Sequence, residues 1–228
     1  MSIPKWRRPR CAIAAAAACL VLTSCTGQSG DDDVVTIGYV PFDESVATSF
    51  LWREILETQG YDVEMQQYQV TTAYQGLASG EIDIFTGGTP VNHSTHWDRY
   101  GDDFVDVGTW YDTLRQGLAV PTYTGLEKIS DLEGKAEEFN GQIVGIEADS
   151  GLMQQTKDDV PEVYDLSGFR LVEGGTQAML ASLERAISRE EPIVVTLWEP
   201  HWAHRYYDIT LLEDDKGAYP TNDTYQAS

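Results

Sequence analysis

The stretch Val194-Val195-Thr196-Leu197-Trp198-Glu199-Pro200-His201-Trp202 (VVTLWEPHW) does most to decide the fold. Its first part is a continuous apolar run, which is typical of a strand that a parallel sheet buries on both faces. The run then changes into a tryptophan, an acid, a proline and a histidine. Because ligands of open α/β folds bind at the carboxyl ends of the strands, this end of the stretch predicts a ligand site.

The N-terminus resembles a bacterial export signal. Its basic part is followed by an apolar run over residues 11–22, which is too short to span a membrane as a helix. Leu22-Thr23-Ser24-Cys25 resembles a lipobox, which predicts a signal peptide over residues 1–25 and a lipidated Cys25 that is enough for stable anchoring. The polar residues 26–33 predict a flexible tether. We therefore expect an extracytoplasmic protein, lipid-anchored to the bacterial cell membrane.

Composition excludes several classes of function. The chain has 37 Asp and Glu against 15 Lys and Arg, a formal net charge of −22, which repels nucleic acid. Its cysteines are Cys11, Cys19 and Cys25, so the predicted mature domain has no disulfide and no thiolate chemistry. The sequence contains neither G-x-S-x-G nor H-E-x-x-H. We therefore expect no nucleic-acid partner, no cofactor and no enzyme.

Strands and helices alternate after the tether. Predicted strands begin at Val34, Val63 and Asp83, and helices that end at Gly60 and Gly80 connect them. Parallel strands need such crossover helices, and the order βαβαβ therefore predicts a parallel sheet with helices on its faces.

The same pattern restarts after a short predicted strand at Leu118–Pro121. A strand at Gln142–Glu147 and a helix at Thr176–Arg189 lead back to the opening stretch. The chain is thus expected to cross twice between two βα units, near Pro121 and near Trp198, which predicts two lobes with a hinged cleft between them. The expected boundaries are residues 34–120 with 200–228 for lobe I, whose C-terminal part looks shortened, and 121–199 for lobe II.

Five short motifs, taken in their order and spacing, resemble one family. They are Gly60-Tyr61-Asp62-Val63, Gly76-Leu77-Ala78-Ser79-Gly80, Gly117-Leu118-Ala119-Val120-Pro121, Ala178-Met179-Leu180-Ala181 and Trp198-Glu199-Pro200-His201-Trp202. From about Thr36 to Gly217 the chain is similar to the glycine betaine/choline-type substrate-binding lipoproteins of ABC importers. The resemblance implies a two-lobed α/β fold of the periplasmic-binding-protein type II. It also implies an importer permease as partner and a quaternary-ammonium osmolyte of the glycine betaine, choline, carnitine or proline betaine type as ligand.

The resemblance implies an aromatic cage. A quaternary ammonium has no N–H to donate, so aromatic faces hold it by cation–π attraction. Trp198 would form one wall and Phe42 another, whereas Trp202 is expected to pack. Glu44 would either face the cation or match the dipole of the helix that it begins. Gly88 stands where the family commonly has a tryptophan, which leaves the cage wider and predicts that Gly88→Trp tightens glycine betaine binding.

The resemblance also implies a site for the ligand's carboxylate. The turn at Ser150 leads from a strand into a helix, and backbone N–H groups at a helix start bind anions. Gly151 and Leu152 would be the backbone donors, with the imidazole of His93 as a further contact. His201 is assigned to the ligand site in the same way.

Two other functions remain open at this point. The histidines form two H-x-x-H pairs, His93/His96 and His201/His204, and four histidines are able to hold zinc. The same fold is also compatible with a ligand sensor that serves a membrane receptor instead of an importer. A zinc titration would decide the first alternative.

Overall fold

The smaller of two sheets organises the N-terminal part of the chain. The computed structural model describes residues 34–221 and 223–228; the predicted signal peptide, Cys25 and the tether lie outside these residues. Three parallel strands pair in the order β2-β1-β3, so the predicted βαβαβ arrangement is confirmed. The elements are β1 (Val34–Tyr39), α1 (Asp43–Thr58), β2 (Asp62–Gln67), α2 (Val70–Ser79), β3 (Ile84–Phe85) and α3 (Ser94–Tyr100).

The sequence of α2 explains why residues 70–79 form a helix. Ala73, Tyr74 and Leu77 recur at helical spacing and are buried. The helix ends at Gly80, which has a φ of 75° in the left-handed region that glycine adopts without strain. The predicted helix end is thereby confirmed, and Tyr74 is fixed in the interior beside the candidate site described below.

The larger sheet has the strand order β6-β5-β7-β4-β8. Residues Val194–Leu197 of β7 are fully buried in its centre, where β7 runs parallel to β5 and antiparallel to β4, so the prediction from the opening stretch is confirmed. The elements are β4 (Gly108–Pro121), β5 (Gln142–Val144), α4 (Gly151–Asp158), α5 (Val160–Val163), β6 (Arg170–Val172), α6 (Thr176–Ser188), β7 (Val194–Glu199), α7 (Ala203–Tyr206) and β8 (Ile209–Leu211). Three 3₁₀ helices, Thr122–Thr124, Ile129–Leu132 and Ala136–Phe139, follow β4.

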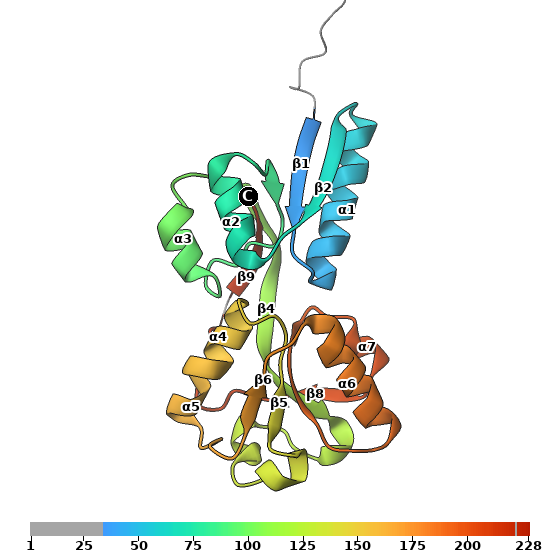
Figure 1. Ribbon diagram of the computed structural model, residues 1–228, viewed down its shortest axis with the longest axis vertical. Coiled ribbons are helices and arrows are strands. Elements are labelled where there is room, and N and C mark those ends of the chain that lie inside the picture. Colours follow the sequence, from blue (N-terminus) through green and yellow to red (C-terminus); the bar gives the residue numbers. More distant parts are fainter. Residues whose placement is uncertain (1–33, 222) are drawn as a thin grey trace, which may run out of the picture. The chain divides into compact units, whose positions relative to one another are not determined.

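Strand β4 is much longer than the sequence pattern indicates. Only its end, Leu118–Pro121, was predicted as a strand, whereas the strand begins at Gly108. Most side chains before Leu118 are exposed or half-buried, so the apolar pattern does not mark them. Figure 1 shows β4 passing from one lobe into the other. Strands β7 and β8 pair with its second half.

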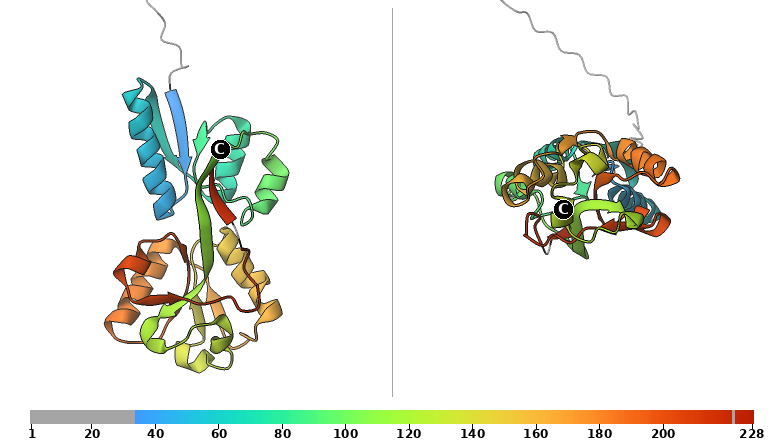
Figure 2. Two further views of the ribbon diagram at one scale, coloured as in Figure 1. Left: turned by 180° about the vertical axis from the view of Figure 1, so that it is seen from behind. Right: turned by 90° about the horizontal axis from the view of Figure 1, so that it is seen from below.

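The last strand, β9 (Asp223–Ala227), returns to the first lobe. It pairs antiparallel with the first half of β4, and Gln226 forms a bridge with Gly88 on its other side. The backbone of Ser228 exchanges two hydrogen bonds with Phe85 of β3, at 2.8 and 3.0 Å. Figure 2 shows β9 beside β4 in the upper lobe. β9 therefore joins the smaller sheet to β4.

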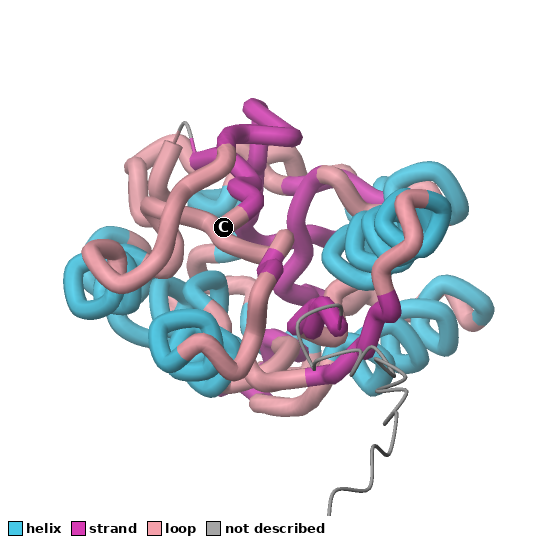
Figure 3. The backbone as a smooth tube through the Cα atoms, turned by 90° about the horizontal axis from the view of Figure 1, so that it is seen from above, coloured by secondary structure: helices cyan, strands magenta, loops and turns pink. Residues whose placement is uncertain are grey.

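The two lobes are defined by these elements. The first contains the smaller sheet, α1 to α3 and β9; the second contains β5 to β8 and α4 to α7; β4 belongs to both. From above, helices flank the strands on both sides (Figure 3). The lobe boundaries at residues 120 and 200 stay a prediction. β8 pairs with β4, so the chain stays in the larger sheet as far as Leu211. Among the described residues, no helix combines the length and apolarity needed to cross a membrane.

Candidate functional site

A pocket lies where the two lobes meet. Its cavity volume is about 30 Å³, above the roughly 10–15 Å³ that a single water needs. The lining residues are Phe42, Gly87, Thr89, Asn92, His93, Leu114, Gln116, Ile146, Ser150, Gly151, Leu152, Trp198 and Tyr225.

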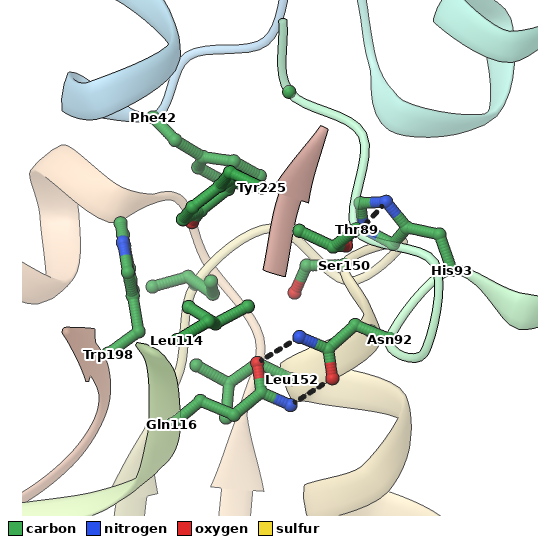
Figure 4. A pocket seen from close by; sticks show the side chains of 13 residues that line it. Phe42, Thr89, Asn92, His93, Leu114, Gln116, Ser150, Leu152, Trp198 and Tyr225 are labelled. Carbon is green, nitrogen blue, oxygen red and sulfur yellow. Dashed lines mark hydrogen bonds between the residues drawn. The ribbon is translucent and has the colours of Figure 1, made fainter. Parts of the chain in front are cut away.

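Aromatic rings form one end of the pocket. Trp198 is the residue before the last of β7, and its exposed fraction is 3%. Phe42 directly precedes α1, and its exposed fraction is 8%. Their ring centroids lie 5.5 Å apart in an edge-to-face arrangement. Tyr225 of β9 brings a third ring, and Figure 4 shows the three grouped together. Three segments that are distant in the sequence therefore supply three aromatic walls.

The start of α4 forms part of the polar end. Ser150 is the N-cap, and its hydroxyl accepts a hydrogen bond from the N–H of Met153 at 3.3 Å. The remaining N–H groups of a first helical turn have no partner within the helix, and they carry partial positive charge. Because Ser150, Gly151 and Leu152 all line the pocket, this helix start suits an anionic group there.

His93 is held as a neutral ring. The hydroxyl of Tyr74 accepts a hydrogen bond from the indole N–H of Trp97 at 3.0 Å, so its own proton is free for Nδ1 of His93 at 3.1 Å. Thr89 Oγ1 lies 2.9 Å from the same nitrogen. Nδ1 therefore accepts, which places the ring proton on Nε2. Burial lowers the pKa of His93 to about 3, so the ring keeps this single donor at physiological pH.

Three side-chain amides connect the lobes below the aromatic rings. Asn92 of the first lobe donates to Gln116 of β4 at 2.9 Å and accepts from the same amide at 2.7 Å (Figure 4). Gln155 of α4 donates to Asn92 at 3.2 Å and accepts from Gln116. The group thus holds the loop before α3 against the second lobe.

Three predicted ligand residues, Glu44, Gly88 and His201, do not line the pocket. Glu44 lies behind Tyr225, whose hydroxyl donates to it at 2.5 Å, and burial raises the pKa of the Glu44 carboxyl to about 7. A Cβ on Gly88 would lie 3.5 Å from the carbonyl oxygen of Gln226, 3.6 Å from the hydroxyl of Tyr74 and 3.7 Å from the ring of Trp97. A side chain at position 88 would therefore lie against β9, outside the pocket lining, and its contact with the ligand stays a prediction.

His201 also lies outside the pocket lining. Its Nδ1 accepts from the N–H of Ala203 at 3.1 Å, which places its proton on Nε2, 3.5 Å from Asp43 Oδ2. Burial lowers its pKa to about 4. Its ring centroid lies 4.7 Å from that of Trp198, so His201 packs behind this wall.

The zinc alternative finds no support. His204 Nε2 hydrogen-bonds the carbonyl of Trp198 at 3.1 Å, while His93 and His201 use their Nδ1 atoms as described above. Across residues 34–221 and 223–228, no three His, Cys, Asp or Glu side chains come together to hold a metal ion.

Of the predicted ligand residues, the structure gathers Phe42, His93, Gly151, Leu152 and Trp198 around one pocket. Sequence reasoning missed others, above all Tyr225, because the C-terminal residues showed no motif. Gln116 lay in the unrecognised half of β4. The Thr89-Pro90-Val91-Asn92 turn after β3 was the one usable signal, since polar residues after a strand end are typical of a site.

The geometry defines a class of protein: a two-lobed solute-binding protein with its site between the lobes. The chain belongs to the family of substrate-binding domains of ABC-type glycine betaine transport systems, named OpuAC, whose model matches residues 33–228. Members of this family bind solutes for transport.

Individual relatives agree with this membership. The chain is 36% identical over 84 residues to the glycine betaine/carnitine transport binding protein GbuC of Listeria monocytogenes, a match that covers 36% of this chain but only 28% of that protein. It resembles the structure of the glycine betaine/L-proline-binding protein ProX of Borrelia burgdorferi, with a TM-score of 0.80, 33% identity, and 85% of this chain and 74% of that one covered. Lactococcal OpuAC, in a closed conformation with glycine betaine, gives a TM-score of 0.80, 30% identity, and 86% and 76% coverage.

Proposed function

We propose that this chain is an extracytoplasmic lipoprotein that captures a quaternary-ammonium osmolyte and delivers it to the permease of an ABC importer. The ligand is of the glycine betaine, choline, carnitine or proline betaine type. Family membership supports the transport role, and the pocket supports the class of ligand.

The observation that carries the proposal is the convergence of Phe42, Trp198 and Tyr225 at one end of the pocket. A quaternary ammonium is attracted to such ring faces by about 0.5–1 kcal/mol per ring at exposed sites and about 2 kcal/mol when desolvated. Phe42 and Trp198 are buried, which favours the upper part of that range. In this proposal Tyr225 supplies the aromatic wall of the cage that is missing at Gly88.

The opposite end suits a carboxylate or a hydroxyl. The start of α4 and the Nε2–H of His93 provide neutral donors. No lysine or arginine occurs among the described residues that line the pocket. A ligand that carries its own positive charge beside its carboxylate needs no further cation, which favours zwitterionic betaines over simple anions.

Calorimetry on the domain from residue 26 onward tests the proposal. Glycine betaine, choline, carnitine and proline betaine are titrated, with tert-butylacetate as the uncharged-head analogue of glycine betaine. We expect at least one quaternary ligand to bind and tert-butylacetate to bind at least about tenfold more weakly, since it lacks the cation–π term. Equal affinity for the analogue, or no binding of any quaternary ligand, would overturn the proposal.

The anchor is tested separately. Radiolabelled palmitate should label the wild-type chain in a bacterial host and leave Cys25→Ala unlabelled, because Cys25 is the proposed lipidation site. Cys19→Ala is the matched control and should remain labelled. Labelling of Cys25→Ala would contradict the assignment.

A further inference from the structure

Glu44 lies behind the aromatic end of the pocket with an incomplete set of partners. Its Oε1 accepts the 2.5 Å hydrogen bond from Tyr225, whereas its Oε2 is buried without a hydrogen-bond partner. The indole N–H of Trp198 is likewise buried without a partner of standard geometry, yet lies near enough to help lower the pKa of the Glu44 carboxyl. Tyr225 and Trp198 both line the pocket. One carboxyl group therefore faces the polar edges of two pocket walls.

The groups around Glu44 provide no positive charge. Asp43 on the same helix is acidic and raises the pKa of Glu44. His201, behind Trp198, is held neutral by burial and faces Asp43. Asp223 of β9 accepts hydrogen bonds from backbone amides of the loop before α3. No lysine or arginine is among the described groups that shift the Glu44 pKa. An ionised Glu44 thus has no protein counter-charge.

We propose that Glu44 is a positioning residue whose ionised carboxylate holds Tyr225 and Trp198 in the cage and supplies the counter-charge for the ligand's quaternary ammonium, so that ligand binding is coupled to release of a proton. The inference rests on the proposed function. It differs from a direct contact, because Tyr225 and Trp198 line the pocket whereas Glu44 does not.

The direction of the coupling follows from linkage. Burial, the largest cause, raises the pKa of Glu44 to about 7, and the Tyr225 hydrogen bond acts against it. A bound cation stabilises the ionised form and lowers the pKa in the complex. Below the pKa of the free protein, binding must therefore expel a proton, and affinity increases with pH until Glu44 is already ionised before binding. Glycine betaine and choline keep their charges in this range, and His93 and His201 remain neutral.

The test measures affinity for choline and glycine betaine by calorimetry at about pH 5.5 and about pH 8. A pKa change of about one unit between free and bound protein gives about tenfold tighter binding at the higher pH. Titrations near pH 6.5 in two buffers of different ionisation enthalpy measure the released proton directly. Glu44→Gln should bind with nearly the same affinity at both pH values. The matched control is Glu81→Gln, since Glu81 also accepts from a tyrosine, Tyr68 at 3.2 Å, but lies at an exposed site away from the pocket.

The outcomes separate this inference from the proposed function. A wild-type protein that binds equally well at both pH values overturns the inference and leaves the proposed function intact. A Glu44→Gln variant that keeps the wild-type pH profile also overturns it, because another group must then titrate. Absence of binding at both pH values overturns the proposed function and this inference with it.

A second variant guards against a folding defect in Glu44→Gln. Tyr225→Phe keeps the Glu44 carboxyl but removes its hydrogen-bond donor, which should move the midpoint of the affinity profile to higher pH. Melting temperatures of both variants are measured alongside. An unchanged midpoint in a folded Tyr225→Phe would show that Tyr225 does not couple Glu44 to the site.

Discussion

A Cβ atom on Gly151 would lie 2.9 Å from the Cβ of Asn92 and closer still to the Asn92 carbonyl oxygen. Gly151 begins α4 in the second lobe, and Asn92 belongs to the loop before α3 in the first lobe. The lobes thus approach to backbone contact at this point, and they do so because position 151 has no side chain.

Gly151→Ala should therefore hinder closure of the lobes. We expect affinity for the quaternary ligand to fall by about tenfold or more, since ordinary contact with the Asn92 carbonyl oxygen requires a shift of about 1 Å. Calorimetry measures the affinity, and small-angle X-ray scattering measures the separation of the lobes. Gly174→Ala is the matched control, because its Cβ would meet the Gly145 carbonyl at an ordinary 3.5 Å. Wild-type affinity in Gly151→Ala would show that closure does not need this contact.

Gln155→Ala should weaken binding without changing the pocket lining. The variant removes two hydrogen bonds, the one that Gln155 accepts from Gln116 and the 3.2 Å one that it donates across the lobes to Asn92. One net hydrogen bond is worth about 0.5–1.5 kcal/mol, so affinity should fall by about two- to tenfold, mainly through faster ligand release. Stopped-flow fluorescence measures the release rate. The exposed neighbour Gln154 provides the control substitution, and equal rates in the two variants would contradict the role of Gln155.

Trp198→Ala should reduce affinity more than truncation of any other aromatic residue. Loss of one cation–π contact accounts for roughly 0.5–2 kcal/mol, or about two- to thirtyfold, and the lost packing against Phe42 adds to this. Trp202→Ala serves as the comparison, since Trp202 is 41% exposed and lies outside the pocket lining. The assignment of Trp198 as a wall fails if the two variants bind alike in calorimetry.

Gly88→Trp should lower stability instead of tightening binding. The new ring would enter the space between Tyr74, Trp97 and the backbone of Gln226, and overpacking of this kind typically reduces the free energy of unfolding by about 1–3 kcal/mol. Urea unfolding measures the loss, with Gly88→Ala as a mild control because its Cβ meets only ordinary contacts. A stable variant with tighter glycine betaine binding would restore the original expectation for this position.

His93 should make the protein sensitive to acid. Its folded-state pKa of about 3 lies below the unfolded value near 6.5, so only the unfolded state takes up a proton as the pH falls between these values. The free energy of unfolding should decrease by about 1.4 kcal/mol per pH unit from this group. Glu44 has the opposite effect between about pH 4.5 and 7. Its pKa is raised in the folded state, so the folded state binds the proton more tightly and a lower pH increases the free energy of unfolding. Urea unfolding of the wild type and of His93→Asn at about pH 5 and about pH 7 measures this contribution. If the free energy of unfolding changes equally between the two pH values in both proteins, His93 does not have this role.

The fold was predictable where burial leaves a periodic pattern. The buried strand at Val194–Leu197 and the helices that stop just before Gly60 and at Gly80 carry strong local signals, and the structure confirms them. The first half of β4 escaped prediction because its exposed side chains show no apolar run. Its strand character comes from pairing with β9, a contact between residues that are far apart in the sequence.

The candidate site was predictable only in part for the same reason. Trp198, Phe42 and the α4 start lie at the ends of predicted elements, which is where ligands bind in α/β folds. Tyr225 and Gln116 are brought to the pocket by pairing partners that no local pattern reveals. The surroundings of Gly88 were not predictable either, because its neighbour in space, Gln226, comes from that same distant strand.

The position of β9 also has a consequence for folding. Residues 223–227 lie between β4 and the loop after β3 and bring Tyr225 to the pocket. A chain in which β9 has not yet paired leaves the backbone of the first half of β4 open to other strands. It also lacks a wall of the cage, so no ligand can stabilise it through that wall. Pairing of β9 therefore both covers this strand edge and completes the part of the pocket through which a ligand adds stability.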